Sequence, residues 1–239
     1  MAEALLEEGY FVTAIVPELP KQPGVLELRN PVLATGITQE FSVAMSERTN
    51  ESGSKATLLK PKKVLNKLGP HSRLQVITAE NKQEVIQRHM KGHSVVISTI
   101  GARAKPRSYV CTGYSDPARA FLPAMKELGI QRFMTIMTDD FLGPIDKIPT
   151  EWRGDGTDET DQLNKVKMDM RRVFDLVLKN QLNFTIWCPK RLVPGPRTDN
   201  FEQKKNEGKA GEVTTGMVAN AIVQELRKGA FAYSRVCIN

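Results

Sequence analysis

Strand-like and helix-like segments alternate from residue 72 to the end of the sequence, with short connections between them. Gly129 marks the end of one helix-like segment, and Pro189 ends an apolar strand-like run. This alternation is typical of a parallel sheet that helices cover on both faces, so it predicts an α/β fold. The expected strands span residues 73–78, 93–99, 132–137, 183–188 and 234–238, and the expected helices span residues 82–91, 116–128, 161–180 and 213–228.

The sequence opens with a helix-like segment, residues 2–8, which Gly9 ends, and continues with a buried strand-like segment, residues 10–16. A helix followed by a strand is the second half of a βαβ unit. The first half would have to precede this helix, where the sequence has only Met1. We therefore expect a sheet that is incomplete at the N-terminus, unless it closes in another way to pair the backbone groups of the neighbouring strands.

Composition narrows the functional class. A chain of 239 residues with 40% apolar content is sufficient for one core, so we expect one domain. The net charge of +7 comes from Lys and Arg that are spread along the chain, and only 6% of the residues are aromatic, so we expect no nucleic-acid partner. Three scattered cysteines predict neither a disulfide framework nor a zinc site, and the sequence has no membrane-length apolar run. We expect a cytoplasmic protein without a membrane or metal partner.

Residues 17–71 interrupt the alternation, because a connection of this length is unusual in such folds. The segment contains four prolines, a polar run at 46–55 and a basic run at 60–63. We interpret it as an irregular insertion, with a basic nucleic-acid-binding arm as the alternative. Residues 31–38, followed by the helix-compatible residues 39–48, also have the outline of a strand, a glycine and a helix, which is the outline of a displaced first strand. Gly36 is the one glycine in that outline, whereas a dinucleotide-binding turn needs several.

Three stretches together are similar to a known family. Residues 92–102 form a strand that runs into a loop of small residues. Residues 124–133 contain a helix, its glycine stop and an Arg-Phe strand entry, and residues 182–189 place a leucine, an aromatic residue, a threonine and an isoleucine shortly before a proline. In this order the stretches resemble the atypical short-chain dehydrogenase/reductase group, in particular NAD(P)-binding proteins similar to biliverdin reductase B, also called flavin reductase, and NmrA-like proteins.

The resemblance implies a Rossmann-like three-layer sandwich with a mostly parallel sheet, in which residues 1–239 form a single NAD(P)-binding domain. It also implies a hydride transfer from NADPH or NADH to a flavin-like or tetrapyrrole-like small molecule. In the family, cofactor contacts follow successive strands, and a hydroxyl after one of them orients the substrate or passes a proton. The implied cofactor-binding residues are Thr99, Ile100, Gly101, Met137, Pro189 and Lys190, and the implied catalytic residue is Thr138.

Arg103 begins a basic loop, residues 103–107, which contains three cations just beyond the expected cofactor strand. Such cations can hold a phosphate, although a solvated basic loop is the alternative. Thr138 is followed by Asp139 and Asp140, where relatives commonly have a serine after the threonine. A carboxylate next to a pyrophosphate is repelled unless it is protonated or paired with a cation.

The largest departure from the family is the missing glycine-rich turn, which would hold the pyrophosphate on a helix N-terminus. In addition, the long helix contains no Tyr-x-x-x-Lys pair, the usual acid of short-chain dehydrogenases. Two hypotheses follow: an NAD(P)H-dependent reductase, and a non-catalytic or truncated descendant that acts as a binding or regulatory module. The sequence gives no indication of the oligomeric state.

Overall fold

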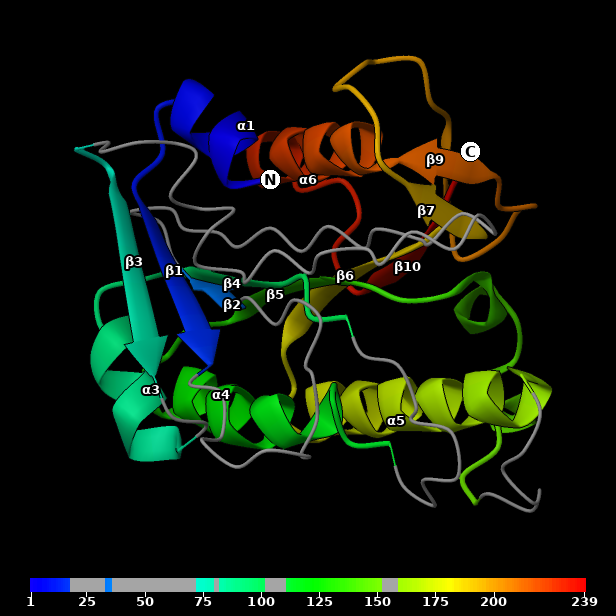
Figure 1. Cartoon of the computed structure of the whole chain (residues 1–239), viewed down its shortest axis with the longest axis horizontal. Coiled ribbons are helices and arrows are strands. Elements are labelled where there is room, and N and C mark those ends of the chain that lie inside the picture. Colours follow the sequence, from blue (N-terminus) through cyan, green and yellow to red (C-terminus); the bar gives the residue numbers. More distant parts are fainter. Residues whose placement is uncertain (18–32, 36–71, 80–81, 102–110, 152–158) are drawn as a thin grey trace, which may run out of the picture.

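A twisted sheet forms the middle layer of the computed structural model, which describes residues 1–17, 33–35, 72–79, 82–101, 111–151 and 159–239 (Figure 1). Within these residues the sheet has eight strands in the order β3-β1-β2-β4-β5-β6-β10-β8. A separate pair, β7 with β9, makes a small parallel sheet. The strands are β1 (Val12–Pro17), β2 (Leu33–Thr35), β3 (Leu74–Ala79), β4 (Val95–Ser98), β5 (Arg132–Ile136), β6 (Asn183–Cys188), β7 (Arg191–Val193), β8 (Gln203–Lys205), β9 (Glu212–Thr214) and β10 (Ser234–Ile238).

Most pairings in the large sheet are parallel, as the sequence predicts. Strands β4, β5, β6 and β10 follow one another as parallel neighbours, and β1 pairs in parallel with β3. Strand β8 pairs antiparallel with β10 at one edge, and β2 pairs antiparallel with both of its neighbours. The expectation of a mostly parallel α/β sheet is therefore confirmed.

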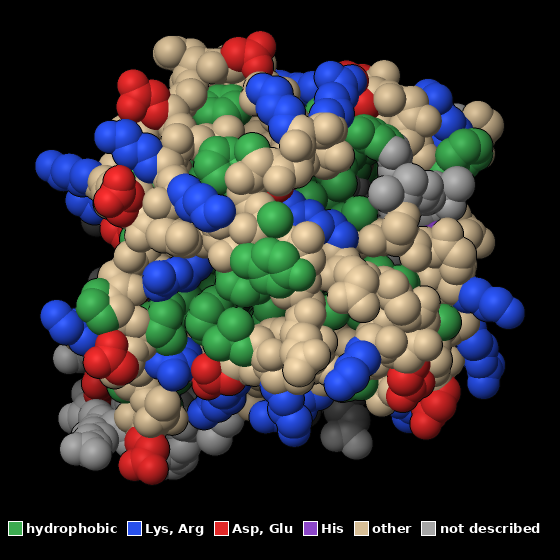
Figure 2. Space-filling model, turned by 180° about the vertical axis from the view of Figure 1, so that it is seen from behind, with side chains coloured by type: hydrophobic (Ala, Val, Ile, Leu, Met, Phe, Trp, Pro, Cys, Tyr) green, Lys and Arg blue, Asp and Glu red, His purple; other side chains and the backbone are tan. Residues whose placement is uncertain are grey.

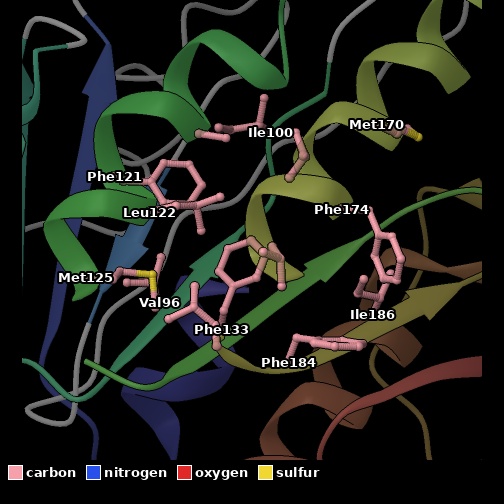
Figure 3. Close-up of a cluster of buried hydrophobic side chains, with 14 of the residues drawn as sticks. Val96, Ile100, Phe121, Leu122, Met125, Phe133, Met170, Phe174, Phe184 and Ile186 are labelled. Carbon is pink, nitrogen blue, oxygen red and sulfur yellow. The ribbon is translucent and has the colours of Figure 1, made fainter. Parts of the chain in front are cut away.

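Helices cover both faces of the sheet, and a separate apolar core lies between the sheet and the helices on each face. Helices α1 and α6 lie on one face, and α3, α4 and α5 lie on the other (Figure 1). Figure 3 shows the second core, where Phe121 of α4 and Phe174 of α5 lie over Phe133 of β5 and Phe184 of β6. The three-layer sandwich is confirmed. The helices are α1 (Ala2–Glu7), α3 (Gln83–Met90), α4 (Ser115–Glu127), α5 (Glu159–Lys179) and α6 (Thr215–Lys228).

Strand β2 occupies the central position of the large sheet, between β1 and β4. Its three residues pair with β1 on one side and with β4 on the other, so the sheet closes and the inner edges of these strands gain backbone partners. Within the outline at 31–38, residues 33–35 therefore form a strand of the sheet, and the remaining residues of the outline lie outside the described part of the chain. The direction of this strand is antiparallel, however, because Leu33 pairs with Ser98 and Thr35 pairs with Val96.

Most of the predicted insertion at 17–71 lies outside the described residues, which include only Pro17 and residues 33–35 of it. The polar run, the basic run and the helix-compatible residues 39–48 belong to the part that the structure does not describe. The interpretations of a solvated insertion and of a basic arm therefore stay predictions.

The three cysteines are buried, unpaired thiols. Burial raises the pKa of the Cys188 thiol to about 12, and it also raises the pKa of Cys111 and of Cys237. A raised pKa lowers the fraction of reactive thiolate at any given pH, and burial blocks the access of a reagent. No group of three or more His, Cys, Asp or Glu side chains in the described part of the chain is arranged to hold a metal ion.

We therefore expect the native protein at pH 8 to react with a thiol reagent such as dithionitrobenzoate far more slowly than the same protein unfolded in urea, in which all three cysteines are accessible. The measurement is the absorbance of the released thiolate over time. Stoichiometric labelling of the native protein at the rate of the unfolded chain would contradict this prediction.

Figure 2 shows one face of the molecule, on which Lys and Arg side chains are dispersed, with Asp and Glu side chains between them. Basic side chains do not gather into a single area of this face. Among the residues that the structure describes, no helix combines the length and the apolar character that crossing a bilayer requires.

Candidate functional site

Strands β4, β5 and β6 end side by side at the carboxyl edge of the sheet, the edge at which open α/β sheets bind ligands. Their registers pair Ser98 with Thr135 and Ile136 with Trp187. The structure therefore brings three predicted groups to one edge. They are Thr99, Ile100 and Gly101 after β4, Met137 and Thr138 after β5, and Pro189 and Lys190 after β6.

Burial separates these residues by what each can offer to a ligand. The side chains of Ile100 and Met137 are 7% and 4% exposed and belong to the core beneath the edge, as Figure 3 shows for Ile100. Pro189 is also buried, whereas Thr99, Gly101 and Thr138 are partly exposed and Lys190 is exposed. Ile100 and Met137 therefore have only backbone atoms to offer, while Thr138 and Lys190 have polar side chains at the edge.

Two arginines hold the segment that follows β5. This segment contains the short helices η2 (Asp139–Leu142) and η3 (Ile145–Lys147). Arg235 of β10 donates from Nη1 to the carbonyl oxygens of Phe141 (2.7 Å) and Gly143 (2.8 Å), and Arg171 of α5 donates to the carbonyl oxygen of Ile145. The ring of Phe141 is fully buried against Phe174. Thr138 therefore lies at the start of a segment that is fixed on two sides.

Thr138 belongs to a short chain of polar contacts. Its hydroxyl lies 3.0 Å from Oδ2 of Asp140, and Oδ1 of the same carboxylate lies 2.8 Å from Nζ of Lys167 on α5. The side chains of Lys167 and Asp140 are 18% and 35% exposed. From the sequence, a carboxylate at this position is expected to repel a pyrophosphate unless it is paired with a cation. In the structure, Asp140 is paired with Lys167.

The centre of the same edge differs from the family arrangement. A parallel first strand would end here in a glycine-rich turn and lead into the helix that binds the pyrophosphate. Strand β2 instead begins at this edge, at Leu33, and ends at Thr35 at the opposite edge. Within the described residues, the usual cradle for a dinucleotide diphosphate is therefore not formed at this edge.

Arg103 and the rest of the basic loop 103–107 lie outside the described residues, so their role in holding a phosphate stays a prediction.

Sequence reasoning did not identify Lys167, Arg171 or Arg235 as part of the site. Lys167 is 27 positions from Asp140, and Arg235 is 94 positions from Phe141. Nothing in the local sequence distinguishes these cations from those on solvated faces, because the packing of α5 and β10 alone brings them to the segment after β5. The adjacent Asp139 and Asp140 were the only signal, since carboxylates at a ligand-binding edge require a partner.

A model of a protein family described as NAD(P)H-binding matches residues 44–228, more than half of the chain. No protein with a curated description is significantly similar to the sequence.

Solved structures share the fold at low sequence identity. A "putative NADH-flavin reductase" from Streptococcus pneumoniae is 20% identical with a TM-score of 0.56, and the match covers 99% of this chain and 90% of that one. A Rossmann-fold NAD(P)-binding family protein from Shigella flexneri is 18% identical with a TM-score of 0.51, covering 72% and 73% of the two chains. A short-chain dehydrogenase/reductase from Veillonella parvula, solved in complex with NADP, is 16% identical with a TM-score of 0.51, covering 72% and 75%. These similarities show a Rossmann-like fold.

Proposed function

The chain belongs to the NAD(P)H-binding family, and from this premise we propose that it is an NAD(P)H-dependent reductase of the flavin reductase and biliverdin reductase B type. The acceptor of the hydride is a flavin-like or tetrapyrrole-like small molecule. In this proposal residues 1–239 act as a single cytoplasmic domain.

One observation carries the proposal: three adjacent parallel strands end at one edge, with Thr138 held there on a braced segment. A bound reduced nicotinamide supplies a hydride, and the protein supplies orientation and exclusion of water. Backbone atoms of Ile100, Met137 and Pro189 approach the cofactor in this proposal, together with Thr99 and Gly101. Lys190 and Arg103 face its phosphates, and Thr138 contacts the acceptor.

A second function is favoured by the direction of β2. An antiparallel strand in the central position runs away from the carboxyl edge, so unlike a parallel first strand it does not lead into a turn and a helix there, and backbone donors to the diphosphate normally come from that turn. On this basis the alternative is a non-catalytic module that retains the sheet and binds other molecules or regulates a partner.

Titration with NADPH, followed by nicotinamide fluorescence, separates the two functions. For the reductase we expect saturable binding that the exposed cation Lys190 strengthens, so that K190Q weakens binding about 3- to 10-fold. K126Q, in the last turn of α4, removes a positive charge that is also exposed but lies away from the carboxyl edge, and it should leave binding unchanged. Absence of binding at millimolar NADPH would exclude the reductase, and tight binding with turnover of FMN would leave the module without support.

A further inference from the structure

The hydroxyl of Thr138 has one hydrogen, and the structure indicates where it points. The oxygen of this hydroxyl lies 3.0 Å from Oδ2 of Asp140. An ionised carboxylate only accepts hydrogen bonds, so Thr138 must be the donor in this contact. The Thr138 hydroxyl therefore has only its lone pairs left for a ligand at the carboxyl edge, and lone pairs accept hydrogen bonds.

Lys167 binds the second oxygen of the Asp140 carboxylate and so holds this side chain in place. Its ammonium group lies 2.8 Å from Oδ1, the oxygen that Thr138 does not use. An ammonium group only donates, so Oδ1 is already used as an acceptor and Oδ2 is the oxygen that remains for Thr138. The carbonyl oxygen of Thr138 also accepts from the backbone N–H of Phe141 at 3.1 Å, which fixes the backbone from which the hydroxyl projects.

We propose that Asp140 and Lys167 are positioning residues that make Thr138 a hydrogen-bond acceptor towards the ligand. The site then favours hydride acceptors that present an N–H or O–H group, such as the ring N–H of a flavin, over acceptors whose polar atoms are carbonyl oxygens alone. A carbonyl oxygen placed at Thr138 would meet lone pairs rather than a hydrogen. This inference rests on the proposed reductase function and concerns the same edge of the sheet.

The decisive variant is D140N, because a side-chain amide can donate to the Thr138 oxygen and thereby release the hydroxyl hydrogen towards the ligand. The probes are FMN, which has a ring N–H, and menadione, whose polar atoms are two carbonyl oxygens. We compare the ratio of kcat/KM for FMN to kcat/KM for menadione, both measured with NADPH. We expect this ratio to fall about tenfold in D140N, the value of one hydrogen bond.

Lys167 and Thr138 provide the matched variants. K167M should lower the same ratio by a smaller factor. K167R keeps the cation, so its ratio should equal that of the unmodified protein. T138V removes the hydroxyl with little change of shape, so D140N should have no further effect on the ratio in a T138V background. A ratio for D140N within twofold of that of the unmodified protein would overturn the inference.

Urea unfolding tests the contact itself, whether or not the protein proves to be a reductase. If the Thr138–Asp140 bond exists, the midpoint shift of the T138V/D140N double variant is smaller than the sum of the two single shifts. D146N, on the exposed turn η3, is the control, and its shift should add to that of T138V. Additive shifts for T138V and D140N would overturn the inference, whereas a lack of NADPH binding with non-additive shifts would overturn only the proposed function.

Discussion

Replacing Glu225 with alanine is expected to lower the free energy of unfolding by about 3–5 kcal/mol, the usual cost of breaking a buried ion pair from one side. Glu225 of α6 is 3% exposed, and its Oε1 lies 2.6 Å from Nη2 of Arg132 on β5. Both carboxylate oxygens also accept from the backbone N–H of Phe231 at 3.1 Å. The pair therefore joins the sheet to α6 and to the segment that leads into β10.

The loss of stability in E225A is large because the side chain of Arg132 cannot reach water without disturbing the fold. The side chain of Arg132 is 15% exposed, and burial lowers its pKa while the charge of Glu225 opposes that shift. In the variant an uncompensated guanidinium group and a backbone N–H remain in a poorly solvated region.

The measurement is urea unfolding followed by circular dichroism, with two controls. E84A removes an exposed glutamate from the first turn of α3 and should change the free energy of unfolding by no more than about 0.5 kcal/mol. Replacing Glu225 and Arg132 together by methionine removes both charges and should cost less than E225A alone. A loss below about 1 kcal/mol in E225A would contradict this account of the pair.

The second large effect is expected at Asp169 of α5, where alanine should lower the free energy of unfolding by about 3 kcal/mol. Asp169 is fully buried, and its Oδ2 accepts from the backbone N–H groups of Tyr114 (2.7 Å) and Ser115 (3.2 Å). These groups lie at the start of α4, where backbone donors have no partner within the helix. Its Oδ1 lies 3.4 Å from Nη1 of Arg172. Alanine removes the acceptor for both N–H groups and leaves a small cavity.

Hydrogen exchange distinguishes this effect from a general loss of stability. In D169A the first-turn amides of α4 should exchange faster relative to those of β5 and β6, because the start of α4 loses its cap. D169N keeps the shape and one acceptor oxygen, so it should cost about half as much. D175A, at an exposed ion pair with Arg171 on the same helix, should cost about 0.5 kcal/mol or less. Equal losses in D169A and D175A would show that the cap contributes little.

The sequence predicted the elements whose apolar pattern is strong and local. Strands β6 and β10 have the predicted bounds, and α3, α4 and α5 differ from the predicted bounds by no more than two residues at either end. Gly129, with φ of +72°, follows the C-terminal end of α4, where the sequence predicted the end of this helix. By contrast, β7, β8 and β9 were missed, because three residues are too few to show a period.

The candidate site was predictable where it depends on strand order and hidden where it depends on packing. Parallel strands joined by helices end at the same edge, so the sequence could place Thr99, Thr138 and Lys190 together without coordinates. The partner of Asp140 required the position of α5 over that edge.

The sequence by itself determined the α/β class, the strands β3, β4, β5, β6 and β10 and the residues that follow them, because hydrophobic periodicity and turn residues act over short distances along the chain. Only the tertiary structure decided that β2 fills the centre of the sheet in the antiparallel direction and that Lys167 neutralises Asp140. The physical reason is the same for both. Backbone hydrogen bonds can form with any strand that fits between two open strand edges, and an ion pair depends on distance in space. Neither the pairing of β2 nor the ion pair of Asp140 therefore leaves a pattern along the chain.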